Sequence, residues 1–568
     1  MKFKDTLDQQ RKPKVIENLY HMVKTGAECF GDKALYYYDR NGEEHVFTYQ
    51  DLFNHVNWFG TSLSSIDLFG KTVAVVGDTC PEYIATYLSV VNGNGVIVPL
   101  PKELEIESLA DFVRISNAEA IVYTKVMNDT LAKHRSLFPG VKSFIAIEPS
   151  EDFETGNGFH KYYDLLETGK KMVESGDTIL TDHTIDMEKM CAILFTSGTM
   201  GTSKGVMLCQ RNLTTATNSA DQSMEYDDRN TFISFLPPYH TYEMTIGQFA
   251  IMNLGATIKI NSSLKRTIKD MATFKPNTLM LVPLFVETMH KKIWDEIDKR
   301  GMRSKVRAAM KLSDAMLAVG IDMREKFFGQ ITSAFGGNLK SIVCGGAALN
   351  PQIIKDFYSF GILILNGYGI TECSPLVSVN RPSGVRLGSV GVPVENCTVR
   401  IDIGDDGKTG EVLVKGDNVM LGYFNNPEAT AEAFTEDGFF RTGDIGYMDK
   451  DGYIYLTGRK KNVIILSNGK NIFPEELEEY IYRIPGILES VVVGRKDENG
   501  EPRITAICVP DLAKFEGMSN EEIEKKIKAE ITALNKKLPI FKQIAITEIR
   551  WEEFEKTASR KIKRFKVV

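Results

Sequence analysis

The sequence predicts an α/β fold with a large N-terminal domain of α/β-sheet layers and a smaller α+β C-terminal domain. A chain of 568 residues is too long for one hydrophobic core. Short β-rich runs, apolar on both faces, alternate with amphipathic stretches, as buried parallel strands and their covering helices require. The character of the chain changes after about residue 457. We therefore expect domains of residues 1–458 and 459–568.

The N-terminal strands come first in this pattern. An apolar run at 72–78 precedes a helix that begins at Pro81, and further strands are expected at 95–100, 120–124 and 143–147. Five later runs each end in glycine, proline or polar residues: 191–197, 231–237, 278–283, 339–346 and 361–369. Ligands of doubly wound sheets bind beyond the carboxyl ends of strands, so we expect the site there.

The C-terminal part is expected to begin with a strand and turn at 462–471. A helix starting at Pro474, strands at 489–495 and 503–510, and a Lys/Glu-rich helix at 519–537 follow. The chain then ends in a tail, residues 556–568, that carries six Lys/Arg and no acid.

Composition excludes several classes of function. The net charge of −7 argues against non-specific nucleic-acid binding, so no nucleic-acid partner is expected. The eight cysteines form no CxxC pair, the opening residues lack the apolar segment of a secretory signal, and no run reaches the ~18 apolar residues of a membrane span. A cytoplasmic location fits best. Dispersed histidines disfavour zinc, so carboxylate and phosphate oxygens should hold any metal.

The stretch FTSGTMGTSKGV, residues 195–206, combines three glycines and five Ser/Thr hydroxyls with Lys204. A Walker A loop would need glycine at Ser203, so this is not one. Glycines still allow close backbone approach, and successive N–H groups with one ammonium suit phosphate. The alternative is an ordinary solvated loop. By itself the stretch indicates only a polyphosphate.

Two further stretches carry candidate site residues. In NGYGITE, residues 366–372, Tyr368 can stack on a base and Glu372 can reach Mg²⁺; the alternative is a tight turn whose tyrosine packs into the core. In FRTGDIGY, Asp444 stands in a Thr-Gly-Asp turn whose carboxylate can accept both ribose hydroxyls. Arg459 lies just before the domain junction. The segment MDKDGY that follows indicates a plain hairpin.

Together, in this order, these motifs resemble the adenylate-forming superfamily from roughly residue 33 to the C-terminus. The motifs are FTSGTMGTSKGV, LPPYHTYE (236–243), CGGAAL (344–349), NGYGITE, GEVLVKG (410–416), RTGDIG (441–446), GRKKNVIILSNGKNI (458–472) and TASRKIKR (557–564). Within the superfamily, LPPYHTYE and the segment 282–297 are most similar to long-chain fatty acyl-CoA synthetases.

The resemblance implies ATP-dependent activation of a fatty acid to acyl-AMP, with release of pyrophosphate, and transfer of the acyl group to coenzyme A. ATP, Mg²⁺ and coenzyme A are the implied cofactors. Thr199 and Glu372 are implied at Mg²⁺ and in catalysis, and Asp444 at the ribose. The full implied binding set is Thr196, Ser197, Gly198, Thr199, Met200, Gly201, Lys204, Gly345, Gly346, Asn366, Gly367, Tyr368, Gly369, Thr371, Asp444, Arg459 and Gly469.

The resemblance also implies a mobile C-terminal domain. Its late lysine maps onto Lys561, which is expected to bridge the substrate carboxylate and the α-phosphate. Arg560 replaces the family's glycine, so Lys563 or Arg564 are alternatives, as is a solvated basic tail. Rotation about the hinge Lys461 is expected to bring the loop around Gly469 to the pantetheine channel.

Acyl binding is expected near LPPYHTYE. His240 is implied in gating or orienting the carboxylate, with a satisfied core histidine as the alternative. The acyl tunnel is expected between residues 240–248 and the segment after CGGAAL, where Met244 and Ala347 are candidates.

The stretch 300–320 places Arg300, Arg303, Lys305, Arg307 and Lys311 beside apolar residues at helical spacing. Such a helix can rest on an anionic bilayer, which would put the protein at the inner face of the membrane. The alternative is a solvated exterior over the core.

Competing functions remain at this point. The acceptor can be acyl carrier protein in place of coenzyme A, or the reaction can stop at the adenylate. No carrier domain follows residue 568, which disfavours a peptide-synthetase module. A third hypothesis is a non-catalytic sensor of acyl chains or adenylates, which predicts damaged catalytic positions.

Overall fold

The computed structural model describes residues 13–196, 203–261, 266–347, 349–404, 407–466, 471–498, 500–556 and 562–567. Its backbone contacts divide these residues into two compact units. Unit 1 holds residues 13–196, 203–398 and 414–438; unit 2 holds residues 399–413 and those from 439 onward. Each unit is described by itself.

One sheet of unit 1 has the strand order β19-β9-β8-β4-β3-β5-β6-β7. Its centre is parallel, as the double-sided apolar runs predicted. At the β19 edge of this sheet, β8 pairs antiparallel with β9, and β9 pairs antiparallel with β19. The strands are β3 (Thr72–Val76), β4 (Val96–Leu100), β5 (Ala120–Tyr123), β6 (Ser143–Ala146), β7 (Phe159–Lys161), β8 (Met190–Thr196), β9 (Lys204–Cys209) and β19 (Gly422–Tyr423).

The second sheet of unit 1 has the order β16-β15-β14-β13-β12-β10-β11-β1-β2. From β1 to β14 the neighbours are parallel, and β15 then pairs antiparallel with β14. The strands are β1 (Ala34–Arg40), β2 (Glu43–Thr48), β10 (Thr231–Ser234), β11 (Thr257–Ile260), β12 (Thr278–Leu281), β13 (Ser341–Cys344), β14 (Leu363–Gly369), β15 (Leu376–Val379) and β16 (Val392–Pro393). All five late runs of the sequence therefore form strands.

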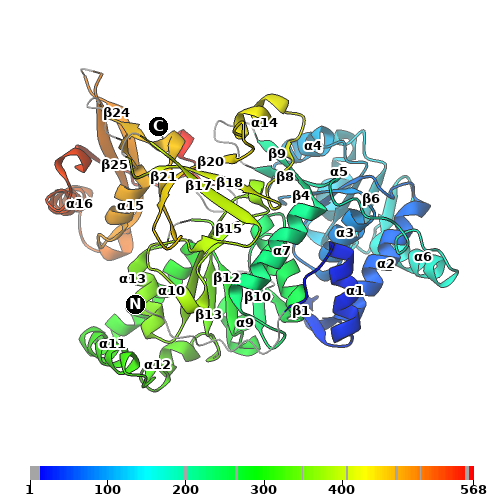
Figure 1. Ribbon diagram of the computed structural model, residues 1–568, viewed down its shortest axis with the longest axis horizontal. Helices are drawn as coiled ribbons and strands as arrows, with labels where there is room; N and C mark the ends of the chain where they lie inside the picture. The colour runs from blue at the N-terminus through cyan, green and yellow to red at the C-terminus, as the bar shows by residue number, and fades with distance from the viewer. Residues whose placement is uncertain are drawn as a thin grey trace. The chain divides into compact units, whose positions relative to one another are not determined.

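Helices pack on both sheets, and α7 (Gln210–Met224) contacts β9 of one sheet and β15 of the other. Local signals begin several of them: Pro81 is the first residue of α3, and Thr48 and Asp51 form a capping box at α2. Figure 1 shows these helices around the two sheets of unit 1. They are α1 (Leu19–Phe30), α2 (Tyr49–Ser65), α3 (Pro81–Asn92), α4 (Ile106–Ile115), α5 (Asn128–Lys133), α6 (Tyr162–Glu174), α8 (Ile251–Leu254), α9 (Thr267–Phe274), α10 (Pro283–Lys299), α11 (Arg303–Ala318), α12 (Arg324–Ser333), α13 (Pro351–Ser359) and α14 (Pro427–Ala433).

Unit 2 contains a sheet of order β17-β18-β20-β21 and a second one of order β24-β25-β26 that α15 and α16 cover. The predicted helices and strands of this part are confirmed, and so is the hairpin at MDKDGY, between β20 and β21. Asp444, expected in a turn, lies within strand β20. The elements are β17 (Cys397–Ile403), β18 (Gly410–Gly416), β20 (Phe440–Met448), β21 (Ile454–Arg459), β22 (Ile464–Ile465), β23 (Asn471–Ile472), α15 (Pro474–Tyr482), β24 (Ile487–Lys496), β25 (Pro502–Pro510), α16 (Asn520–Asn535) and β26 (Ile546–Ile549).

Every helix within the described residues is too short or too polar to cross a membrane.

A buried polar network holds the π-helix η3 (Tyr242–Ala250) against the second sheet of unit 1. The carboxylate of Glu243, 1% exposed, accepts hydrogen bonds from the hydroxyl of Ser234 and from Nε2 of Gln248 at 2.7 Å. Tyr36 on β1 donates to Oε1 of Gln248 at 2.8 Å. Burial raises the pKa of Glu243 to about 7 despite these bonds. A π-helix interrupts regular packing and frequently marks a functional segment.

Glu243 predicts a pH dependence of stability. Its pKa is higher in the folded than in the unfolded protein, so its contribution is fully present below about pH 4.5 and is lost as the pH rises through about 7. We expect Glu243→Gln to remove this loss, which amounts to up to about 3 kcal/mol. The measurement is denaturant unfolding of both proteins at pH 5 and pH 8, followed by the fluorescence of Trp58 and Trp294. An equal stability difference between the two proteins at both pH values would contradict it.

Candidate functional site

Lys204 and Thr196 lie at the loop end of the β8–β9 hairpin. Thr196 is the last residue of β8, Lys204 is the first of β9, and the two are paired across the strands. The hydroxyl of Thr196 donates to the carbonyl of Lys204 at 3.4 Å. The other residues predicted for the phosphate loop, Ser197, Gly198, Thr199, Met200 and Gly201, lie outside the described residues. The hairpin therefore places one ammonium beside the predicted loop.

Tyr423 connects Lys204 to Glu372. Its hydroxyl donates to Oε1 of Glu372 at 3.0 Å, and Nζ of Lys204 lies 4.6 Å from the centroid of its ring. Burial, and then the charge of Glu372, raise the pKa of the Tyr423 phenol, so the hydroxyl stays protonated and donates. Three residues far apart in the sequence thus place a cation and an anion on either side of one aromatic ring.

A largely apolar pocket lies at the ends of β13, β14 and β15 in unit 1. Its empty volume is about 500 Å³ including the open mouth. Tyr368, 6% exposed, forms part of the wall, so this side chain is buried and also borders the pocket. Of the predicted residues, Gly345, Gly346, Gly367 and Gly369 line the same pocket. Gly346 has a φ of +91°, which a residue with a side chain rarely adopts.

The remaining predicted residues of this region are close in sequence to residues that line the pocket. They are Asn366, Thr371 and Glu372. Asn366 is buried on β14, and its Nδ2 donates to the carbonyl of Ser389 at 3.4 Å. Thr371 and Glu372 form a short 3₁₀ turn, residues Thr371–Cys373, between the lining residues Gly369 and Pro375. The structure therefore brings the glycines, Tyr368 and the turn bearing Glu372 to one strand edge.

The expected acyl region overlaps this pocket in part. Tyr242 and Ile246 of η3 line it. Met244 is buried but is not among the lining residues, and neither is the exposed Ala347. His240 precedes η3, where its ring packs on Tyr239 at 4.5 Å between centroids. The structure thus places the π-helix at the pocket wall and His240 outside its lining.

Unit 2 contains a separate charged cluster. Nε of Arg459 pairs with Oδ1 of Asp444 at 2.6 Å, across paired positions of β20 and β21. Asp444 is only 5% exposed. Beside them, the carboxylate of Glu411 accepts hydrogen bonds from Nζ of Lys460 at 2.8 Å and from the backbone N–H of Gly443 at 3.1 Å. The carboxylate of Asp444 is thus buried within β20 and lies beside an arginine.

Lys461, the predicted hinge residue, stands in a 3₁₀ turn, residues Lys460–Asn462, after β21. Burial and the nearby Arg459 and Arg564 lower its pKa to about 8. The neighbouring side chain of Asn462 donates to Oε1 of Glu475 at 2.5 Å. The hinge assignment remains a prediction.

The C-terminal tail is anchored on both sides of the predicted catalytic lysine. Lys556 and Ile562 form a β-bridge, and Lys556 pairs with Glu489. Arg564 pairs with Glu478 at 2.6 Å and donates to the carbonyl of Val492 at 2.9 Å. Lys561 itself, like Arg560 and Gly469, lies outside the described residues.

The contacts of the tail include the two alternatives to Lys561, which are Lys563 and Arg564. The ammonium groups of Lys563 and Lys566 both pair with Glu555, and Arg564 is held by Glu478. Each of these cations already has a carboxylate partner. These contacts describe Lys563 and Arg564 only, and the assignment of Lys561 remains a prediction.

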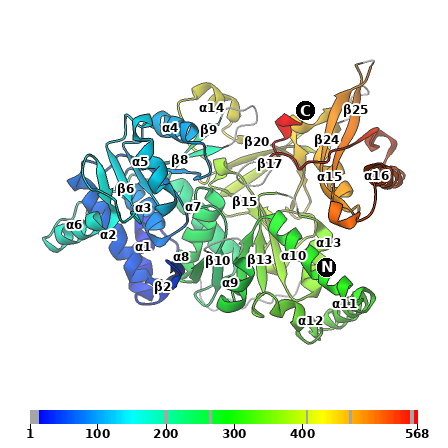
Figure 2. The same cartoon turned by 180° about the vertical axis from the view of Figure 1, so that it is seen from behind.

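The basic stretch 300–320 forms the predicted helix, α11, at one edge of unit 1 (Figure 2). Three of its five cations have partners within unit 1: Arg300 pairs with Glu296, Arg303 with Asp298 and Arg307 with Asp356. Asp356 is fully buried and also contacts His290 at 2.9 Å. Arg303 and Arg307 thus link α11 to α10 and α13, Arg300 pairs within the end of α10, and Lys305 and Lys311 are exposed.

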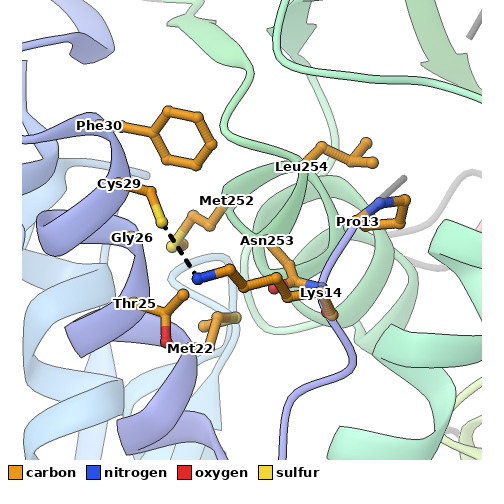
Figure 3. A pocket seen from close by; sticks show the side chains of 10 residues that line it. All are labelled: Pro13, Lys14, Met22, Thr25, Gly26, Cys29, Phe30, Met252, Asn253 and Leu254. Carbon is orange, nitrogen blue, oxygen red and sulfur yellow. Dashed lines mark hydrogen bonds between the residues drawn. The ribbon is translucent and has the colours of Figure 1, made fainter. Parts of the chain in front are cut away.

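A small hollow elsewhere in unit 1 is lined by residues outside the predicted binding set. It lies between α1 and α8, where Nζ of Lys14 donates to Sγ of Cys29 at 3.4 Å (Figure 3). Nδ2 of Asn253 donates to the carbonyl of Lys14 at 2.9 Å. These contacts attach the segment before α1 to the body of the unit.

The capacity of the site to hold a metal ion depends on its His, Cys, Asp and Glu side chains. Within the described residues, no group of three or more His, Cys, Asp or Glu side chains is arranged to hold one. Glu372 offers a carboxylate oxygen, which suits Mg²⁺, an ion that is commonly bound by one or two carboxylates and the phosphates of its substrate. Glu372 therefore suits a Mg²⁺ ion that arrives bound to a polyphosphate.

Sequence reasoning missed Tyr423, Glu411 and Tyr242. Glu411 lies in the motif GEVLVKG and Tyr242 in LPPYHTYE, but nothing local singles out either residue within its motif. Each of the three becomes a site candidate only through contacts with residues distant in the chain. For Tyr423, the sole signal is its position seven residues after the motif GEVLVKG.

Comparisons with known proteins agree with these features. The model of the AMP-binding enzyme family matches residues 23–424, and that of the AMP-binding enzyme C-terminal domain matches residues 461–568. FadD15 of Mycobacterium bovis, named a long-chain-fatty-acid–CoA ligase, is 33% identical over 342 residues, which cover 57% of this chain. The matched stretch spans only about half, 55%, of that relative.

Two other comparisons cover more of the chain. AEE15 of Arabidopsis thaliana, named a chloroplastic long-chain-fatty-acid–[acyl-carrier-protein] ligase, is 24% identical over 89% of this chain and 78% of its own. The crystal structure of ATP-bound MatB from Rhodopseudomonas palustris superposes with a TM-score of 0.74 at 21% identity, covering 97% of this chain and 98% of that one. The fold is therefore that of adenylate-forming enzymes, and the chain belongs to the AMP-binding enzyme family.

Proposed function

We propose that this protein is an ATP-dependent ligase that joins a long-chain fatty acid to coenzyme A through an acyl-AMP intermediate. The observation that carries the proposal is the arrangement of Lys204 and Glu372 around Tyr423, at the strand edge whose glycines line an apolar pocket. The ligase names of the relatives support the substrate class. The domain boundary at residues 458 and 459 is part of the proposal.

In the first half-reaction, a carboxylate oxygen of the fatty acid attacks the α-phosphorus of ATP. The bond from that phosphorus to the oxygen bridging the α and β positions breaks, and pyrophosphate leaves. Charge builds on the phosphate oxygens, so this step needs positioned cations more than a strong base. Lys204 and residues 197–205 are assigned to the β- and γ-phosphates, and Lys561 to the oxygens of the carboxylate and α-phosphate.

The other groups orient the nucleotide. Asp444 is assigned to the ribose hydroxyls with Arg459 beside it, and Tyr368 to the adenine with Gly345 and Gly346. Glu372 and Thr199 are assigned to Mg²⁺, which when bound neutralises phosphate oxygens. His240 is assigned to the entry of the acyl site. The η3 side of the pocket, formed by Tyr242 and Ile246, is assigned to part of the acyl chain, and the side formed by Tyr368 and the glycines to the adenine.

In the second half-reaction, the thiolate of coenzyme A attacks the acyl carbon, the acyl–phosphate bond breaks, and AMP leaves. We assign the change between the two steps to rotation about Lys461, which removes Lys561 and brings the loop at Gly469 to the thiol. The short turn around Lys461 and the tail anchored on unit 2 support this assignment, because the tail would move with that unit. The adenylate must stay dry meanwhile.

The substrate and acceptor are tested by assaying pyrophosphate release with C2 to C20 carboxylates, with and without coenzyme A, and by mass analysis of the product. We expect the highest kcat/KM with long chains and an acyl-CoA product. Pyrophosphate release without thioester formation would reject the ligase to coenzyme A. Thioester formation on acyl carrier protein alone would favour the function in the name of AEE15, and the absence of any turnover would favour a sensor.

The roles of Lys561 and Lys461 are tested on the two half-reactions. We expect Lys561→Ala to lower adenylation at least 100-fold, because a neutral side chain cannot stabilise the transition-state charge, and to spare thioester formation from supplied acyl-AMP. Lys461→Pro is expected to do the reverse, because proline restricts the backbone of the hinge. The measurements are single-turnover rates of each half-reaction.

Lys566→Ala is the matched control, because it removes an ammonium of the same tail that pairs with Glu555. We expect it to change neither half-reaction more than about twofold. Equal losses in both half-reactions for Lys561→Ala and for Lys461→Pro would refute the two-conformation mechanism.

We further propose that the protein is cytoplasmic and contacts the inner face of the membrane through the exposed side of α11. Lys305 and Lys311 are exposed there, Leu312 is 54% exposed and Val319 75% exposed. Cations beside apolar side chains suit an anionic bilayer surface. Sedimentation with vesicles of 30% phosphatidylserine tests this. We expect binding that 0.5 M salt weakens and that Lys305→Glu with Lys311→Glu abolishes; unchanged binding of that variant would reject the contact.

A further inference from the structure

We propose that Tyr423 is a positioning residue that keeps Lys204 and Glu372 apart, so that both charges remain available to a magnesium-bound nucleotide. This inference rests on the proposed function, because it assigns Lys204 to phosphate and Glu372 to Mg²⁺. It adds a residue outside the motifs that carried the family resemblance.

The side chain of Tyr423 makes contacts through both its ring and its hydroxyl. Tyr423 is 8% exposed, so its ring and hydroxyl are held by the surrounding protein. The hydroxyl donates to one oxygen of Glu372, Oε1, at 3.0 Å. The ring faces the ammonium of Lys204 at 4.6 Å, within the range of a cation–π interaction. One side chain therefore contacts both charges, each through a different part.

The backbone fixes where this side chain lies. β19 pairs with β9, so Tyr423 stands opposite Val206, two residues after Lys204. The flanking N–H groups of Leu421 and Phe424 donate to the carbonyls of Met207 and Gly205 at 3.0 and 2.7 Å. These bonds set the distance between the ring and the first residue of β9.

The turn that bears Glu372 is tied to the same segment. The N–H of Met420 donates to the carbonyl of Glu372 at 2.8 Å. The N–H of Tyr423 donates in turn to the hydroxyl of Thr430 at 2.9 Å. The segment of the tyrosine is thus anchored to the strand that bears Lys204 and to the turn that bears Glu372, and the tyrosine is not a freely rotating surface side chain.

Separation of the two charges has a physical consequence. A lysine and a glutamate that approach each other in a poorly solvated site attract strongly and tend to pair, which would neutralise both. In the part of the chain that the structure describes, no ion pair joins Lys204 to an acid. The ring of Tyr423 takes up the ammonium without neutralising it, and the hydroxyl occupies only one oxygen of Glu372. Among the described residues, the N–H donors of Lys204 and Oε2 of Glu372 therefore remain for a ligand.

The two functions of the side chain can be separated by substitution. Tyr423→Phe keeps the ring beside Lys204 and removes only the hydrogen bond to Glu372. Tyr423→Leu removes both contacts and allows Lys204 to pair with Glu372. A purely structural tyrosine would not link its effect to Mg²⁺ or to Glu372, which makes the magnesium dependence of binding the decisive readout.

The experiment is calorimetric titration of the full-length protein with ATP, with and without Mg²⁺, so that binding is measured apart from catalysis. We expect Tyr423→Phe to weaken binding of magnesium-bound ATP about tenfold, as for loss of one hydrogen bond to a charged group, and to change magnesium-free binding less than twofold. We expect Tyr423→Leu to weaken both. In the Glu372→Gln background, Tyr423→Phe should have less than a twofold further effect, because the two residues act together.

Tyr49→Phe is the matched control: its hydroxyl is also buried and donates to the carbonyl of Ala256 at 2.7 Å, in another part of unit 1. It should leave both affinities unchanged. Unfolding midpoints without ligand show whether a variant folds; if Tyr423→Leu does not, Tyr423→Phe carries the test alone. Wild-type affinity in Tyr423→Phe, or an equal loss in the Glu372→Gln background, overturns the inference. If the wild-type protein binds magnesium-bound ATP and forms no acyl product, the ligase function fails while the role of Tyr423 is still decided by binding.

Discussion

The pairing of β9 with β19 is the contact on which the candidate site of unit 1 depends. It joins the strand that begins with Lys204 to a two-residue strand more than 200 positions later in the chain. That pairing brings Tyr423 between Lys204 and Glu372, and the hydrogen bond from Met420 to the carbonyl of Glu372 attaches the turn of the second sheet to the same segment. A cation and an anion that would otherwise pair are thereby held on opposite parts of one aromatic side chain.

Unit 2 shows the opposite arrangement, because its cations pair directly with acids. Arg459 and Lys460 are directed to different carboxylates, those of Asp444 and Glu411, and three cations after Ile562 are paired with Glu478 or Glu555. The exposed pairs of Glu555 contribute little stability individually, and the pairs as a whole assign each charge a place. The tail is consequently anchored on both sides of the segment that holds Lys561. An anchored segment can deliver one lysine with less loss of entropy than a free tail.

The π-helix η3 joins the pocket to the core. Its Tyr242 and Ile246 line the pocket, while its Glu243 is buried in a network with Ser234, Gln248 and Tyr36. An unfavourable buried carboxyl that is kept at this position indicates that the placement of η3 matters more than local stability. The helix α11 shows the opposite use of charge, because its arginines are largely taken up by pairs within unit 1.

The sequence by itself determined the alternation of strands and helices, the presence of buried parallel strands and the family, and it predicted a site at the ends of the late strands. Those properties follow from apolar periodicity and from motifs that are contiguous in the chain. It also marked Asp444 and Arg459 separately, although it placed Asp444 in a turn and not in β20. Only the tertiary structure decided that Asp444 pairs with Arg459, that Tyr423 stands between Lys204 and Glu372, that Lys563 and Arg564 are engaged by acids, and that Tyr242 faces the pocket. The physical reason is that strand pairing and burial between distant segments depend on which chain segments meet, and no local pattern of residues specifies that meeting.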